Sequence, residues 1–225
     1  MYPKAERAVR DLLRKRGQLV RHKTATLLSI QHLLTRNTGV SLSGNRIKQL
    51  SMADLERLVP EADLALAVRS TLAVMHCLAA EIGILERTVK ERVKLRPAFT
   101  QLLSVSGLGD ILALTIMLET GESGRFATVG NYASYCRCVG SQKLRNGKRK
   151  GQGNTKNGNK YLAWAFVEAA NCAVRYTSQI KRYYQRKKDK TNGVVALKAV
   201  AHTLARACYY VRRDQVPFET AKAFG

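Results

Sequence analysis

Amphipathic patterning dominates the first 95 residues of the chain. Between residues 5 and 36, apolar side chains recur at helical spacing, with Lys and Arg between them. This period predicts one long helix, and Asn37-Thr38-Gly39 is a typical stop signal for it. The apolar stripe consists of Val9, Leu12, Leu13, Leu19, Val20, Leu27, Ile30, Leu33 and Leu34.

A second long helix is predicted from Glu61 to Leu95, after Pro60. Its apolar positions step by 7, 3, 4, 3 and 4 residues, which is a heptad seam. The seam consists of Val68, Met75, Leu78, Ile82, Leu85 and Val89. A short helix near 51–58 lies between the two long ones, and Ser51-Met-Ala-Asp54 resembles a capping box.

Two long helices with a connector predict an antiparallel coiled-coil hairpin over residues 1–96. One interpretation is a dimerisation segment, through which the chain forms a homo-oligomer. The other is the core of an ordinary helical bundle. The pattern alone favours neither.

Residues 97–225 form a second predicted domain, because Arg96-Pro97 ends the second long helix. Val105-Ser-Gly107-Leu-Gly109 is followed at once by an apolar helix, which is the pattern of a helix-hairpin-helix motif. Gly107 and Gly109 would allow a tight turn and bring the amides of the next helix to a DNA phosphate. A plain helical joint has the same spacing.

Further helices are predicted at 129–138, from Tyr161 onward, at 178–190 and at 193–212. The helix from Tyr161 is apolar on nearly all sides, Trp164 included, and is expected to be central. The tail around Pro217 is expected to be irregular, and no strand is predicted. The fold class is therefore all-α: a long antiparallel coiled-coil hairpin followed by a helical domain with a helix-hairpin-helix motif.

The most basic stretch runs from residue 137 to 160, with eight Lys or Arg and no acidic residue. A Gly-rich segment of this composition builds no core, and its amides and cations can approach phosphates closely. It predicts a flexible cationic loop that binds nucleic acid, although a solvated surface loop has the same composition. The predicted contacts are Lys143, Arg145, Lys148, Arg149, Lys150, Lys156 and Lys160.

Charge points to the same kind of partner. The chain has 39 Lys plus Arg against 16 Asp plus Glu, a net charge of +23, which favours a polyanion such as double-stranded DNA. No apolar run of membrane-spanning length and no signal peptide are found, so a cytoplasmic, nucleoid-associated protein without a membrane partner is expected. An RNA-binding or ribosome-associated helical protein without catalysis is the alternative.

Local motifs identify no catalytic or metal centre. The six Asp residues are scattered, and no nucleotide-binding loop or zinc-protease motif occurs. Cys136-Arg-Cys138 is the only close cysteine pair, and small buried side chains are a better interpretation of it than a zinc site. No metal ligand and no cofactor are therefore predicted on this chain.

From about Arg96 to Phe218, the order of motifs resembles the C-terminal transposase domain of the bridge-RNA insertion-sequence family (the IS one-ten family). The resemblance is carried by LLSVSGLGDILALTIMLETGESGRF, NYASYCRCVGS and NGKRKGQGNTKNGNKYLAWAFVEAA, in that order. The two-helix segment before it is similar to the coiled coil that precedes this domain in the family.

The resemblance implies a DNA recombinase that works with a structured guide (bridge) RNA and assembles through its coiled coil. It also implies a RuvC-like domain, whose acidic residues bind Mg²⁺, and a serine that attacks DNA. Residues 1–225 show no RuvC-like segment, and Arg145 stands where the serine is expected. Ser141 is the nearest hydroxyl and would serve only in a different loop register. The expectation is a truncated transposase, inactive as this chain alone; an active fragment with Ser141 as nucleophile is the alternative.

Overall fold

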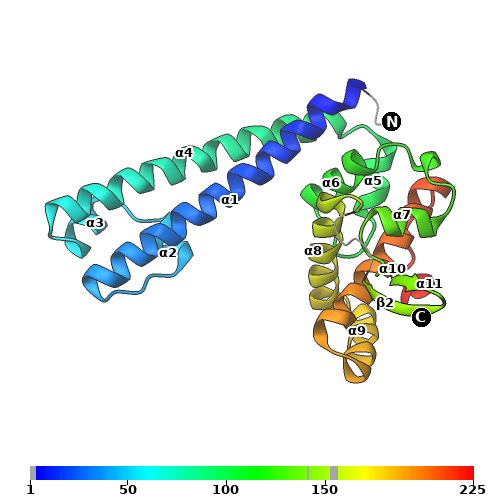
Figure 1. The fold of residues 1–225 in the computed structure, drawn as a ribbon. Coiled ribbons are helices and arrows are strands. Elements are labelled where there is room, and N and C mark those ends of the chain that lie inside the picture. The colour runs from blue at the N-terminus through cyan, green and yellow to red at the C-terminus, as the bar shows by residue number, and fades with distance from the viewer. Residues whose placement is uncertain (1–3, 141, 153–156) are drawn as a thin grey trace. The chain divides into compact units, whose positions relative to one another are not determined.

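The computed structural model describes residues 4–140, 142–152 and 157–225. The chain is 77% helical, so the predicted all-α class is confirmed. It divides into two compact units: a two-helix unit, Asp11–Val89, and a helical domain made of Met1–Arg10 with Lys90–Gly225. Figure 1 shows their elements.

Two antiparallel helices, α1 (Lys4–Thr38) and α4 (Ala62–Val93), form the long part of the two-helix unit, and both were predicted. Between them lie α2 (Gly44–Lys48), which was not predicted, and α3 (Met52–Leu58). The capping box of α3 is confirmed, because the Ser51 hydroxyl accepts from the Asp54 amide and the Asp54 carboxylate accepts from the Ser51 amide.

Residues of the α4 heptad seam pack against other helices of the same chain. Val68 and Met75 are fully buried in one cluster with Ile30 and Leu34 of α1 and with residues of α2 and α3. An ion pair between Arg16 and Glu86, 2.6 Å from guanidinium nitrogen to carboxylate oxygen, joins α1 to α4 further along. The seam thus supplies internal core, and self-association stays a prediction.

By length and composition, α4 would suffice to cross a bilayer: an 18-residue window has a mean hydropathy of 1.4, and 22% of it is buried. The expectation that no apolar stretch is long enough is therefore wrong. A helix that packs in a protein core can have the same length and hydropathy, and Val68 and Met75 of α4 do pack in a core. It carries no argument for a membrane.

In the described part of the helical domain, five helices pack around α8 (Lys160–Tyr176) and α10 (Gly193–Asp214). The others are α5 (Pro97–Leu103), α6 (Asp110–Thr120), α7 (Val129–Tyr135), α9 (Ser178–Lys190) and α11 (Thr220–Phe224), with a short 3₁₀ turn at Ser123–Arg125. Nearly all of α6 is buried, as its apolar sequence requires.

Two expectations about this domain are wrong. Trp164 is 45% exposed, because it lies on the face of α8 opposite the buried Ala165 and Ala169. The tail is not irregular throughout: α11 forms after Pro217 and buries Phe224 against the ring of Tyr183, with 5.2 Å between ring centroids.

The turn between α5 and α6 lies directly on α8. Gly107 has a φ of +87°, and a Cβ there would lie 2.3 Å from the carbonyl oxygen of Ala169 and 2.9 Å from the Cβ of Ala173. Gly109 differs, because its φ is −92° and nothing lies within 4 Å of an added Cβ. The first glycine is therefore required by packing and backbone geometry, and the second is not.

Gly107→Ala is expected to destabilise the protein by about 2–5 kcal/mol, since it combines left-handed strain of about 1–2 with overpacking of about 1–3 kcal/mol. Gly109→Ala is the matched control, and its cost is expected to stay below about 1 kcal/mol. Urea unfolding of the two variants beside the wild type measures both values. Equal destabilisation by the two changes would contradict this account of the turn.

Candidate nucleic-acid interface

A β-hairpin stands where the sequence predicted a flexible loop without strands, so that expectation is wrong. Strand β1 (Gln142–Arg145) pairs antiparallel with β2 (Lys148–Gln152). The turn between them is Asn146-Gly147, with φ of 50° and 71°. Positive φ at both positions is the type I′ geometry, and Asn-Gly is its strongest sequence signal. That dipeptide could have revealed the hairpin.

We call residues 142–152 the cationic hairpin. It contains five Lys or Arg and no acidic residue. Arg145 lies directly opposite Lys148 in the strand register, and the pairing shifts between Lys143 and Leu144. Arg145, Lys148 and Lys150 are exposed. Like charges that face each other across a strand pair repel each other. The hairpin therefore concentrates mutually repelling positive charges in a short segment.

The remaining predicted contacts are only partly visible. Ser141 and Lys156 lie outside the described residues, as do the side chains of Lys143 and Arg149. Lys160 is exposed at the start of α8, with its Nζ 5.2 Å from the ring centroid of Tyr161. The structure therefore brings Arg145, Lys148 and Lys150 together on one hairpin and leaves the role of Ser141 a prediction.

Hydrogen bonds join the two chain segments at the base of the cationic hairpin. The amide of Asn159 donates to the carbonyl of Tyr135 at 2.7 Å. The guanidinium of Arg137 donates to the carbonyls of Asn157 and Gly158, both at 3.0 Å. Arg137 itself has a left-handed φ of 57°. Arg137 belongs to the basic stretch, but its guanidinium binds backbone carbonyls. A count of charges does not predict this role.

Asn159 organises the elements around this base. Its Oδ1 accepts from the amides of Tyr161 and Leu162 at 2.8 and 3.2 Å, and so caps α8. Its Nδ2 donates to the buried carboxylate of Glu119 at 2.7 Å. A buried carboxylate requires such donors. An Asn just before a helix is a recognisable cap signal, but no sequence pattern indicates the contact between Asn159 and Glu119.

Arg125 lies near the same base, in the loop after α6. Its guanidinium carbon is 4.6 Å from the ring centroid of Phe126 and 4.7 Å from that of Tyr135. The residue is nevertheless exposed. Stacking on two rings fixes a planar cation in one orientation, which suits recognition of a phosphate group.

The helix-hairpin-helix prediction is not confirmed. The α5–α6 turn exists, and the helix α6 begins at Asp110, but the Asp110 carboxylate forms an ion pair with Lys90. An acidic side chain at a helix N-terminus competes with phosphate for that position. Contacts of Gly107 and Gly109 with DNA therefore stay a prediction.

Cys136 and Cys208 are buried near α7 and α10, and Cys138 is half-buried. Burial raises the pKa of the Cys138 and Cys208 thiols to about 12, and it raises that of Cys136 still further. Among the described residues, no group of three or more His, Cys, Asp or Glu is arranged to hold a metal ion. Burial also lowers the pKa of His202, with help from Arg206.

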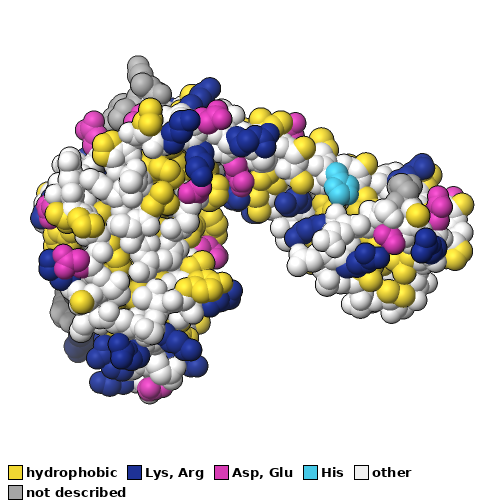
Figure 2. All heavy atoms as spheres, turned by 180° about the vertical axis from the view of Figure 1, so that it is seen from behind, with side chains coloured by type: hydrophobic (Ala, Val, Ile, Leu, Met, Phe, Trp, Pro, Cys, Tyr) yellow, Lys and Arg dark blue, Asp and Glu magenta, His cyan; other side chains and the backbone are white. Residues whose placement is uncertain are grey.

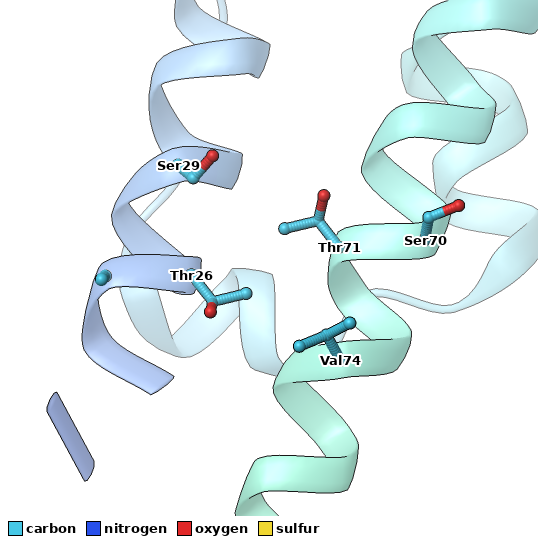
Figure 3. Close-up of a pocket in the computed structure, with 6 residues that line it drawn as sticks. Thr26, Ser29, Ser70, Thr71 and Val74 are labelled. Carbon is cyan, nitrogen blue, oxygen red and sulfur yellow. The ribbon is translucent and has the colours of Figure 1, made fainter. Parts of the chain in front are cut away.

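The two-helix unit has a hollow of about 460 Å³ between α1 and α4. Figure 3 shows its lining, in which Thr26 and Ser29 lie on one helix and Thr71 and Val74 on the other. The hydroxyls of Thr26 and Thr71 donate to backbone carbonyls of their own helices. The six residues that line the hollow include no charged side chain and no His that could activate a hydroxyl, so it is no candidate for chemistry.

Comparison with known proteins shows that part of this domain is similar to a family of transposases. The sequence model described as Transposase IS116/IS110/IS902 family matches residues 100–185, which run from α5 into α9. The match includes the cationic hairpin, Arg125 and Asn159. No curated protein matches the chain.

The cysteines give a test of the domain interior. With a pKa of about 12, roughly one thiol in ten thousand at Cys138 and Cys208 is ionised at pH 8, and thiolate is the reactive form. Exposed Cys77 is therefore expected to react first with an aromatic disulfide reagent, half-buried Cys138 more slowly, and buried Cys208 only after unfolding. Mass spectrometry of the timed reaction identifies the labelled residues. Fast labelling of Cys208 in the folded protein would show that the α10 interior opens.

Proposed function

Because residues 100–185 carry the transposase domain of the IS116/IS110/IS902 family, we propose that the chain is a DNA-binding part of an insertion-sequence transposase. In this proposal the cationic hairpin contacts the phosphate backbone of duplex DNA. A transposase acts on DNA, and the hairpin is the most concentrated positive segment within the matched region.

One observation carries the proposal: the facing pair Arg145 and Lys148 on an exposed two-strand hairpin. Two strands alone are marginally stable, and facing like charges weaken them further. An anion between the two side chains reverses the sign of that interaction. The hydrogen-bonded base holds the hairpin in place, so its cations approach a backbone from a fixed position.

Arg125 would add a second kind of contact. Its guanidinium is already held over Phe126 and Tyr135, so little conformational freedom is lost when it binds a phosphate. Contacts of this type position a protein on DNA but do not read bases. We therefore expect binding to depend weakly on sequence, with target choice supplied by another component, such as the guide RNA that the family resemblance implies.

Strand transfer is a separate question. The attack needs an activated nucleophile, and metal-bound carboxylates would orient the phosphate. Arginine at position 145 stays protonated and cannot be that nucleophile. The described acidic residues form no metal-binding group. We propose that this chain alone binds DNA without cutting or joining it, and that Mg²⁺ enters only with a RuvC-like domain.

Neutralising the hairpin tests the binding proposal. In Arg145→Gln/Lys148→Gln/Lys150→Gln, the slope of log affinity against log salt is expected to become shallower by about 2–3, since each phosphate contact contributes about 0.9. Fluorescence anisotropy of a labelled 30-base-pair duplex over a salt series measures it. Arg21→Gln/Arg36→Gln/Arg69→Gln, on exposed positions of α1 and α4, removes the same charge and should change the slope little. Equal effects of the two triple variants would show that only the total charge of the chain matters, and would contradict a specific contact by the hairpin.

Trapping of a covalent protein–DNA adduct tests the chemistry. Wild type, Ser141→Ala and Arg145→Ser are incubated with element-end DNA, guide RNA and Mg²⁺, then denatured and separated by size. No adduct is expected from wild type. An adduct that appears only with Arg145→Ser, after a metal-binding domain is added, would support a lost nucleophile at 145. A wild-type adduct abolished by Ser141→Ala would overturn the proposal and make Ser141 the nucleophile.

A further inference from the structure

Helix α9 carries a second concentration of positive charge, apart in sequence from the cationic hairpin. Its 13 residues include six Lys or Arg and one acidic residue, Asp189. All six basic residues are exposed: Lys181, Arg182, Arg186, Lys187, Lys188 and Lys190. Figure 1 places α9 at the lower end of the helical domain, and Figure 2 shows dark blue side chains gathered at that end.

Little within the described residues offsets these positive charges, apart from cation–π contacts of Arg186 and Lys187 with the Tyr183 ring, at 6.0 and 5.7 Å. In the part of the chain that the structure describes, no salt bridge involves an α9 residue, although exposed ion pairs occur elsewhere, as between Lys222 and Glu219. The carboxylate of Asp189 accepts instead from the neutral amide of Gln185 at 2.6 Å. Arg182 and Arg186 are four positions apart, where like charges destabilise a helix.

The helix dipole accounts for only half of the basic residues of α9. Lys187, Lys188 and Lys190 lie in the last turn, where cations interact favourably with the helix dipole. Lys181 and Arg182 lie toward the first turn, where cations are unfavourable and where α9 has no acidic residue. Their presence there adds repulsion to the folded chain, and an external anion would remove it.

The inner face of α9 is firmly attached. Ile180 is fully buried, and the Tyr183 ring meets Phe224 of α11 edge to face. The helix also packs along α8 and α10. Its charged face is therefore presented outward in one orientation, and it cannot turn inward to find a partner within the domain.

We propose that the outer face of α9 is a second binding surface for the phosphate backbone of duplex DNA, distinct from the cationic hairpin. This rests on the proposed function, that the chain binds DNA. A helix of 13 residues is about 20 Å long, which spans about six nucleotides of one strand at 3.4 Å each. Two separate contact surfaces would hold one duplex at two places along its length, or two duplexes.

The experiment compares three triple variants with wild type on the same labelled 30-base-pair duplex over a salt series. The α9 variant is Lys181→Gln/Arg182→Gln/Arg186→Gln, in which Gln keeps the helix propensity of Lys and Arg. The other two are Arg145→Gln/Lys148→Gln/Lys150→Gln and the control Arg21→Gln/Arg36→Gln/Arg69→Gln. Thermal unfolding without DNA is measured at low salt for each.

The α9 variant is expected to lose affinity and to give a slope shallower by about 2–3 than wild type, because about three phosphate contacts are lost. Its melting temperature without DNA is expected to stay equal or rise, because repulsion is removed. A merely structural role for these side chains would instead lower the melting temperature and leave the slope unchanged. Wild-type affinity and slope in the α9 variant would overturn the inference.

The outcomes separate this inference from the proposed function. If wild type shows no salt-dependent binding to the duplex, the proposed function fails, and with it this inference. If wild type binds but only the hairpin variant is weakened, the inference alone fails. Parallel titrations with a single-stranded RNA and with anionic phosphatidylserine vesicles check the partner. A loss by the α9 variant confined to either of them would also overturn the assignment to duplex DNA.

Discussion

The side chain of Asn159 connects the elements on which the cationic hairpin depends. Its oxygen satisfies two amides at the start of α8, and its nitrogen donates to the buried carboxylate of Glu119 in α6. The backbone amide of the same residue donates to Tyr135 at the end of α7. One residue thereby fixes where the chain leaves the core and returns to it. Hydrogen bonds among buried and half-buried groups thereby fix the points between which the hairpin segment runs.

The long helices could be predicted because their apolar positions repeat with the helical period, and burial follows that period. Ser51 with Asp54 likewise specifies a local cap that tertiary contacts do not alter. The cationic hairpin was missed for the opposite reason: its composition is that of a disordered loop, and only Asn146-Gly147 signals the turn. Arg137, Glu119 and Asn159 are harder still, since their roles come from contacts across 20 to 40 positions. Such contacts leave no periodic trace in a single sequence.

The two-helix unit shows what a heptad pattern leaves open. A heptad seam predicts that an apolar stripe will be covered, but it does not say by which chain. Here Val68 and Met75 of α4 are covered by Ile30 and Leu34 of α1. Leu66 and Val74, which lie off the seam, remain about half exposed. The most buried seam positions are thus not free for association between copies of the chain, and homo-oligomer formation stays a prediction.

A net charge of +23 would oppose folding if it were spread through the structure, because like charges repel more strongly when the chain is compact. The core of the helical domain avoids this cost, since α6 and the inner faces of α8 and α10 are almost wholly apolar. Part of the positive charge is instead gathered in a short hairpin and on the outer face of one helix. A polyanion that binds these elements stabilises the folded state by mass action, in proportion to its affinity and concentration. Under the proposed function, a phosphate backbone would relieve the repulsion between like charges at these two surfaces.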